Sequence, residues 1–169
     1  VLGELHDVAD AFVVNISSPN TPELRRLQTP RYLDGLLADL SAAMRLRAGL
    51  APPKPLLVKI SPELAPADLD ELLASALDNG IAAIIATNTT TDRAGVVSLA
   101  GGERGGLSGR PLASRSTDVI RHIHRQTGGR MPVIGVGGIF TGSDVVDKLE
   151  AGASLVQAYT GFIYRGPRF

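Results

Sequence analysis

The segment from Val13 to Pro22 reads VVNISSPNTP, and it predicts a buried strand that ends in a polar loop. Its first apolar residues are β-branched, which favours a pleated strand, and its prolines end the ladder because proline has no N–H to donate. Asn15 interrupts the apolar run, although a strand buried on both faces should be almost wholly apolar. Ser18, Asn20 and Thr21 then follow within a few residues. Polar residues that interrupt an apolar strand pattern in this way are typical of functional sites.

Apolar strands and amphipathic helices alternate along the rest of the chain. We expect strands at about 12–17, 56–60, 81–87, 132–136 and 155–159. We expect the end of a helix in residues 1–10, helices that begin near Pro30 and Pro66, one over about 114–127, and one between Thr141 and Gly152. Thr29 and Thr141 are the predicted N-caps, Thr141 with Asp144 in a capping box. This alternation implies parallel strands joined by right-handed crossovers.

Two α/β architectures fit that order, an open doubly wound sheet and a (β/α)₈ TIM barrel. Polar residues at the carboxyl end of every strand favour the barrel, whose active site is built at that rim. A full barrel takes about 250 residues, so 169 residues predict a partial barrel of about five consecutive βα units. The first residue is Val1 and the segment after it reads as a helix entered midway, so we expect a longer parent protein. The open edges of such a piece would expose strand backbone and apolar core.

The composition narrows the function classes. Apolar residues make up 44% of the chain and support a globular core, while acidic and basic residues are equal in number, 17 each, and give no overall electrostatic signal for nucleic acid. The absence of cysteine excludes disulfides and thiolate metal sites. No apolar run approaches the roughly 18–20 residues of a transmembrane helix.

Two strand ends carry side chains that suit an anionic or amide-bearing ligand. Lys59 lies inside an apolar strand, where a lysine needs a partner unless its ammonium reaches solvent. The segment Thr87–Thr90 ends the next strand; it is either a capped turn or a binding edge, because Asn88 can both donate and accept hydrogen bonds.

Glycine-rich turns follow later in the chain. Gly105–Pro111 does not fit the P-loop pattern, and a glycine-rich loop can be only a connection. Gly135–Gly138 comes directly after a strand and before a helix, so its backbone N–H groups can face a phosphate, although it lacks the dinucleotide fingerprint. Tyr159–Gly161 closes the last strand, and barrel phosphate sites lie after strands seven and eight.

The histidines and arginines do not predict a separate site. His122 and His124 are two positions apart on a helix, so they point in different directions and cannot share a metal ion. We therefore expect no metal. The arginines from Arg104 to Arg125 read as a solvated face, and we expect no nucleic-acid partner.

The segment Asn15–Pro22, followed by Leu24-Arg25, resembles the active-site loop of dihydroorotate dehydrogenases. It is most similar to the quinone-dependent class 2, in which serine holds the general-base position, whereas the cytosolic class usually has cysteine there. The resemblance covers the whole chain as the central and C-terminal part of a single FMN-binding barrel domain, 1–169. The family's N-terminal helices, its early strands and its final helix are absent from these residues.

The resemblance implies an FMN enzyme of pyrimidine synthesis that oxidises (S)-dihydroorotate to orotate and reduces a membrane quinone. It implies Ser18 as the catalytic base. It assigns to the substrate Asn15, Asn20, Asn88 and Thr89, and to the flavin Asn15, Lys59, Thr87, Gly109, Gly138, Tyr159 and Thr160. It also implies a peripheral membrane protein on the cytoplasmic face. The 169-residue piece alone should be inactive.

Three other interpretations remain open on the sequence. One is another FMN-dependent reductase of pyrimidine-like rings, although those enzymes generally use a cysteine acid. A second is a non-redox barrel that binds a phosphorylated metabolite through Gly138 and Tyr159. The third is an inert, partly folded piece.

Overall fold

The computed structural model describes residues 2–18, 30–94, 96–97 and 99–169. The helices and strands, in chain order, are α1 (Leu2–Leu5), β1 (Phe12–Asn15), α3 (Pro30–Ala48), β2 (Leu56–Ile60), α4 (Pro66–Asp78), β3 (Ala83–Ala86), α5 (Ala113–Thr127), β4 (Val133–Val136), α6 (Gly142–Glu150), β5 (Leu155–Gln157) and α7 (Thr160–Arg165). All five predicted strands are present, and most are shorter than predicted. β1, β3 and β5 end earlier than predicted, although Thr87 still donates its N–H to Val136 O at 2.9 Å.

The five strands form one sheet in the order β1-β2-β3-β4-β5, and every neighbouring pair is parallel. A doubly wound sheet reverses its strand order at a switch point, whereas the strands of a barrel pair in sequence. The sequential order therefore decides between the two predicted architectures. The prediction of a partial α/β barrel is confirmed.

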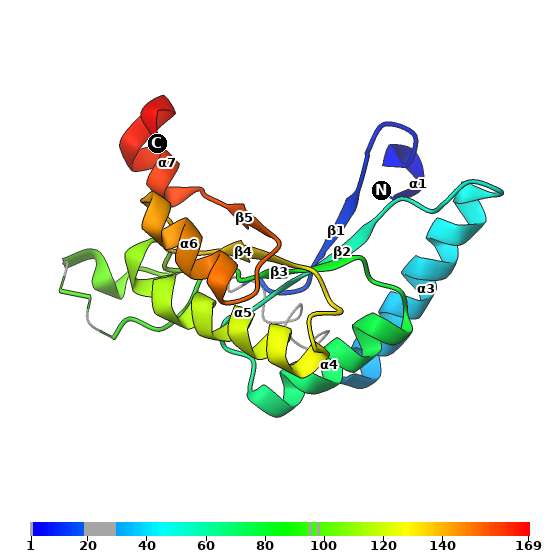
Figure 1. Ribbon diagram of the computed structural model, residues 1–169, viewed down its shortest axis with the longest axis horizontal. Helices are drawn as coiled ribbons and strands as arrows, with labels where there is room; N and C mark the ends of the chain where they lie inside the picture. Colours follow the sequence, from blue (N-terminus) through cyan, green and yellow to red (C-terminus); the bar gives the residue numbers. More distant parts are fainter. Residues whose placement is uncertain (1, 19–29, 95, 98) are drawn as a thin grey trace.

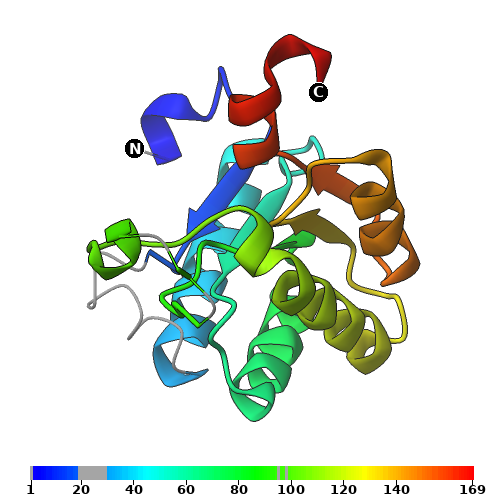
Figure 2. The same cartoon turned by 90° about the vertical axis from the view of Figure 1, so that its left-hand side faces the viewer.

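Helices α3, α4 and α5 cover one face of this sheet. Figure 1 shows α3, α4 and α5 along one side of the strands, and Figure 2 shows α1 and α7 on the other side from α4 and α5. The main apolar core lies between the sheet and helices α3, α4 and α5. It contains, among others, Leu33, Leu37, Val58, Ile60, Leu72, Leu73, Ile84, Ile120, Ile123 and Val133.

The opposite face of the sheet carries a smaller apolar cluster. Leu57, Ala83 and Ile85 are buried there, with Ile134 and Val136 partly buried beside them. Side chains alternate along a strand, so Lys59 shares this face with Leu57. In a barrel this face points to the interior. Lys59 therefore lies on the face that is opposite to the main core.

Capping residues set the helix boundaries near the rim. Thr141 caps α6, with both halves of the Thr141–Asp144 capping box formed, as predicted. Gly128 ends α5 in the left-handed conformation, which glycine adopts without steric cost. The predicted N-cap Thr29 lies outside the described residues.

The two edges of the sheet are more exposed than its centre. Val13 on β1 is 49% exposed and Leu155 on β5 is 63% exposed, whereas Val58 and Ile84 in between are fully buried. Among the described residues, none of the helices is both long enough and apolar enough to span a bilayer.

The core predicts a large stability difference between two leucines that both lie in helices. Leu72 is 1% exposed and Leu46 is 85% exposed. In the full-length protein, Leu72→Ala should lower the free energy of unfolding by about 2–5 kcal/mol, because it removes buried methyl groups and leaves a cavity. Leu46→Ala should change it by less than about 0.5 kcal/mol. Urea unfolding measures both values, and equal losses would contradict the assigned core.

Candidate active site

A pocket opens at the carboxyl ends of β2 to β5. The lining residues are Lys59, Thr87, Asn88, Thr89, Ser108, Gly109, Leu112, Val136, Gly137, Gly138, Ile139, Gln157, Ala158, Tyr159 and Thr160. Eight of these were predicted from the sequence as ligand contacts, and they come from five separate segments of the chain. Parallel pairing in sequential order is what brings them together. Ser108 and Gln157 were not predicted.

A hydrogen-bonded group of three polar side chains lies where β1 and β3 end. Ser17 donates through Oγ to Asn15 Oδ1 over 3.0 Å, and Asn88 Nδ2 donates to Ser17 Oγ over 3.0 Å. Asn88 Nδ2 also lies 3.4 Å from Asn15 Oδ1, while Asn88 Oδ1 accepts from the Thr89 N–H at 2.8 Å. Two of the three predicted substrate asparagines, Asn15 and Asn88, are thus held by protein hydrogen bonds.

Ser17 is the site residue that the sequence interpretation missed. It is 1% exposed and connects Asn15 to Asn88. The signal was present in the strand period, because Asn15 and Ser17 are two positions apart and share a face, whereas Ser18 does not. Ser18 itself is half-buried in the loop after β1. The predicted substrate residue Asn20 and its neighbour Thr21 lie outside the described residues.

Lys59 contributes a positive charge to the wall of the pocket. It pairs with Asn15 on β1 and with Ile85 on β3, so the strand ladder fixes its backbone on both sides. The side chain is half-buried, and within the described part of the chain its ammonium makes no hydrogen bond or ion pair. A half-buried cation without a protein partner fits an anionic or electron-rich ligand in this pocket.

Glu63 holds the loop that follows Thr89, and it too was missed. Its carboxylate accepts from Thr90 Oγ1 at 2.5 Å, from the Thr91 N–H at 3.1 Å and from Ser61 Oγ at 2.7 Å. One carboxylate therefore ties the loop after β2 to the loop after β3, and so supports the pocket wall that contains Asn88 and Thr89.

Two glycine turns form the other side of the pocket. Gly138 has φ +76°, and a Cβ there would lie 2.4 Å from Ala113 Cβ and 2.8 Å from Ala113 N. Gly109 has φ +85°, and a Cβ there would lie 3.2 Å from Thr160 Cγ2. Both the left-handed backbone and the close packing require glycine. The turns expose backbone rather than side chains to the pocket, which suits a phosphate.

The last strand closes the pocket through Tyr159 and Thr160. Thr160 Oγ1 donates to Ser108 Oγ over 2.9 Å, which joins the start of α7 to the loop before Gly109. Tyr159 is 75% exposed, so it lies at the mouth of the pocket.

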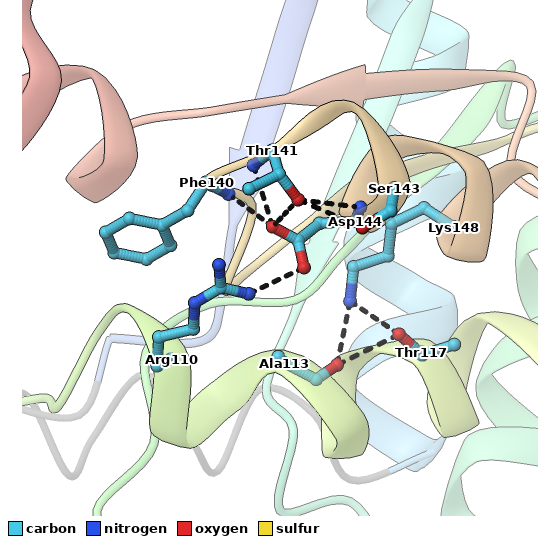
Figure 3. Close-up of polar contacts among 8 residues, drawn as sticks. All are labelled: Arg110, Ala113, Thr117, Phe140, Thr141, Ser143, Asp144 and Lys148. Carbon is cyan, nitrogen blue, oxygen red and sulfur yellow. Dashed lines mark hydrogen bonds and ion pairs between the residues drawn. The ribbon is translucent and has the colours of Figure 1, made fainter.

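A polar network behind the glycine turns holds them together (Figure 3). Asp144 accepts from the N–H groups of Phe140 and Thr141, both at 2.8 Å, and from Arg110 Nη1 at 2.6 Å. Burial acts to raise the pKa of Asp144, but the hydrogen bonds from Phe140, Thr141 and Arg110 outweigh it and lower the pKa to about 2. Asp144 is therefore ionised at every physiological pH.

Lys148 lies in the same region, 2% exposed. Its ammonium donates to Ala113 O at 2.9 Å and to Thr117 Oγ1 at 2.8 Å. Burial lowers its pKa to about 8, against the attraction of Asp144, Asp147 and Asp118, which raises it. A buried lysine with two acceptors ties α6 to the first turn of α5.

Several other titratable side chains are bonded to protein groups. His122 Nε2 lies 2.7 Å from Asp70 Oδ1 and joins α5 to α4. In the arginine run, Arg121 pairs with Asp118 and Arg115 donates to Pro62 O. Within the described ranges, no group of three or more His, Asp or Glu residues could hold a metal ion.

The family model for "Dihydroorotate dehydrogenase" matches residues 1–169, the whole chain. The chain belongs to the dihydroorotate dehydrogenase family. Two similar proteins are named dihydroorotate dehydrogenase (quinone). The one from Salinispora arenicola is 51% identical over 166 residues, covering 96% of this chain and 46% of that protein. The one from Anaeromyxobacter dehalogenans is 52% identical over 166 residues, covering 98% of this chain and 45% of that protein.

The solved structures agree with this family. The ligand-free dihydroorotate dehydrogenase of Eimeria tenella matches with a TM-score of 0.89 and 37% identity, over 98% of this chain and 50% of that one. The same enzyme in complex with ferulenol matches with a TM-score of 0.88 and 36% identity, over 94% of this chain and 46% of that one. The chain thus spans about half the length of the family members that it matches.

The low pKa of Asp144 predicts a pH-dependent stability. Because the folded pKa of about 2 lies below the ordinary 3.8, the ionised carboxylate stabilises the folded protein above about pH 4, and this contribution is lost as the pH falls toward 2. In the full-length protein, the stability gap between wild type and Asp144→Asn should narrow by about 1 kcal/mol between about pH 5.5 and about pH 3.5.

Urea unfolding at each pH measures this gap. Asp147→Asn, which removes the same charge from an exposed position on α6, is the matched control for the loss of one negative charge. A constant gap for Asp144→Asn would contradict the assigned hydrogen bonds.

Proposed function

We propose that the full-length protein oxidises (S)-dihydroorotate to orotate with bound FMN and passes the electrons to a quinone. The observation that supports this most directly is the single pocket at the strand ends, which joins Lys59, Asn88, Thr89 and the two glycine turns. The proposed reaction is that of the dihydroorotate dehydrogenase family, to which the chain belongs. We also propose that residues 1–169 are part of a single barrel domain.

The pocket fits FMN by its chemistry. The glycine turns at Gly109 and Gly138 offer backbone to a phosphate, with Tyr159 and Thr160 closing the same end. Lys59 supplies a cation that has no partner among the described residues. Asn15 on β1 and Thr87 just after β3 lie at the ends of the two strands that flank β2. When bound, FMN supplies the acceptor for the hydride that leaves C6 of the substrate. Lys59 stabilises negative charge on the ring, as preorganised cations do at sites where charge develops.

The asparagine group fits the substrate side. Asn15 Oδ1 is occupied by Ser17 and Asn88, and the Asn15 amide nitrogen has no hydrogen bond within the described residues. It is therefore free to donate to a carbonyl or carboxylate oxygen of a pyrimidine. Thr89 adds a hydroxyl next to Asn88, and Asn20 completes the proposed set.

Ser18 is the proposed general base that removes the proton from C5. A serine hydroxyl is a weak base, so the proton has to move onward, and Thr21 is the nearest hydroxyl further along the same loop. Ser18 follows directly after Ser17, which is anchored to Asn15 and Asn88. The base is thus held by the same hydrogen bonds that orient the substrate amides.

Quinone use and membrane attachment complete the proposal. The relatives are named for quinone use, and Ser18 in place of cysteine agrees with that class. A quinone dissolves in the bilayer, so we place the full-length protein at the membrane surface, on its cytoplasmic face, as a peripheral protein.

Ser18→Ala tests the base. General base catalysis is worth about 10²–10⁴-fold, so in the full-length protein this change should slow the reduction of bound FMN by dihydroorotate by about that factor. FMN content should stay unchanged, because Ser18 lies on the substrate side. Ser18→Cys should retain more activity than Ser18→Ala, since a thiolate can accept the proton. Anaerobic stopped-flow spectroscopy across pH is the measurement. Reduction within a few-fold of the wild-type rate would show that Ser18 is a turn residue only.

Lys59→Ala tests the cation. The variant should bind FMN more weakly or reduce it more slowly, because it loses a preorganised charge worth on the order of a few kcal/mol. Lys54→Ala, at a half-buried lysine in the loop before β2, is the control and should leave both properties unchanged. If Lys59→Ala keeps the wild-type flavin content and reduction rate, the Lys59 ammonium points to solvent and does not contact the flavin.

A further inference from the structure

The two glycine turns of the pocket are tied to each other by one carboxylate. Arg110 directly follows Gly109, and its guanidinium donates to Asp144 Oδ1 at 2.6 Å. Phe140 and Thr141 follow Gly138 and donate their N–H groups to Asp144 Oδ2 at 2.8 Å. Asp144 thus bonds to residues that follow both turns, and Figure 3 shows its contacts with Arg110, Phe140 and Thr141.

The geometry of this pair is well defined on both sides. Arg110 stacks over the Phe140 ring, with 4.8 Å from Cζ to the ring centroid, so the guanidinium is held by the ring as well as by the carboxylate. The Asp144 side chain is 15% exposed and belongs to the capping box of α6. The charge pair is therefore anchored to a helix and does not depend on two flexible surface side chains.

Lys148 adds a second tie at the same place. Its ammonium donates to Ala113 O, and Ala113 is the residue that lies against Gly138. The stem of Lys148 passes over β4, because a Cβ on Gly135 would lie 3.4 Å from Lys148 Cβ. Gly138 thus packs against Ala113, which Lys148 holds, and lies two positions before Phe140, whose N–H donates to Asp144.

We infer that Asp144 is a positioning residue for the phosphate end of the pocket, acting through Arg110 on the Gly109 turn and through the Phe140–Thr141 N–H groups on the Gly138 turn. The inference rests on the proposed function, since the phosphate is that of FMN. Preorganised backbone donors bind an anion better than mobile ones, because the cost of ordering them has already been met in folding.

The effect of neutralising Asp144 separates this role from simple electrostatics. Asp144→Asn removes a negative charge near the phosphate, so Coulomb's law alone predicts equal or tighter FMN binding. It also replaces the acceptor of the Arg110 bond with an amide that cannot hold the guanidinium in the same way. A positioning role therefore predicts weaker FMN binding, against the Coulombic direction.

The experiment compares FMN with riboflavin, which lacks the phosphate. Apoprotein of the full-length wild type, Asp144→Asn and Arg110→Gln is titrated with each flavin, and fluorescence quenching gives the dissociation constants. We expect both variants to bind FMN about 10-fold more weakly, at the lower end of what outer partners contribute at other preorganised sites. Riboflavin affinity should change less than about twofold. The double variant should lose no more than either single variant, because the two residues act as one unit.

Matched controls remove the same charges elsewhere. Asp147→Asn lies on the exposed face of α6, and Arg121→Gln removes an exposed arginine of α5 that pairs with Asp118. Both should keep the wild-type ratio of FMN to riboflavin affinity. Arg110 is half-exposed, so Arg110→Gln keeps the test valid if Asp144→Asn folds poorly.

The outcomes test the proposed function and the role of Asp144 separately. A wild type that binds neither flavin overturns the proposed function and this inference with it. A wild type that prefers FMN, together with variants that keep that preference, overturns the role of Asp144 alone. Weaker FMN binding in Arg110→Gln with unchanged or tighter binding in Asp144→Asn would mean that Arg110 contacts the phosphate directly, and it also overturns the inference.

Discussion

Parallel pairing in unbroken sequential order is the constraint on which the rest of this structure depends. Each strand pairs with its sequence neighbours, so the carboxyl ends of all five strands meet at one rim. Residues as far apart as Asn15 and Asn88 come within hydrogen-bonding distance because of this register. If the strand order reversed at a switch point, Asn88, Lys59 and the glycine turns would not line one pocket.

The two sides of the rim present different chemical groups to the pocket. The side near β1 to β3 carries amides, hydroxyls and the Lys59 cation, held by Ser17 and Glu63. The side near β4 and β5 offers backbone at Gly109 and Gly138, held by Asp144 and Lys148. In both halves a buried or half-buried polar group behind the pocket fixes the residues that face it. The burial costs of Asp144 and Lys148 are offset by several hydrogen bonds each, which is the condition for a stable buried charge.

Much of the fold could be predicted because it depends on local patterns. The strand over Leu56–Ile60 is a continuous apolar run, and the α6 start follows from the Thr141–Asp144 capping box. Site residues that stand out within such patterns, such as Asn15 and Lys59, could be named for the same reason. The strand ends could not be placed, since the N–H groups of Thr87 and Asn88, beyond the end of β3, bond to Val136 O and Ile60 O, which are distant in sequence.

The supporting residues of the site were harder to predict because their partners are distant in sequence. Ser17 was expected within the first strand, and its partner Asn88 lies 71 positions along the chain. Glu63 and Lys148 received no role from the sequence, and each bonds to a different segment. Such residues are recognised by tertiary contact, which one sequence does not contain.

The most direct test of the account is a crystal structure of the full-length protein grown with orotate. The account predicts flavin density with its phosphate between the Gly109 and Gly138 turns, its ring beside Lys59, and orotate against Asn15 and Asn88. Flavin density with the phosphate at another place on the rim, or a pocket that holds neither flavin nor orotate at saturating concentrations of both, would contradict it.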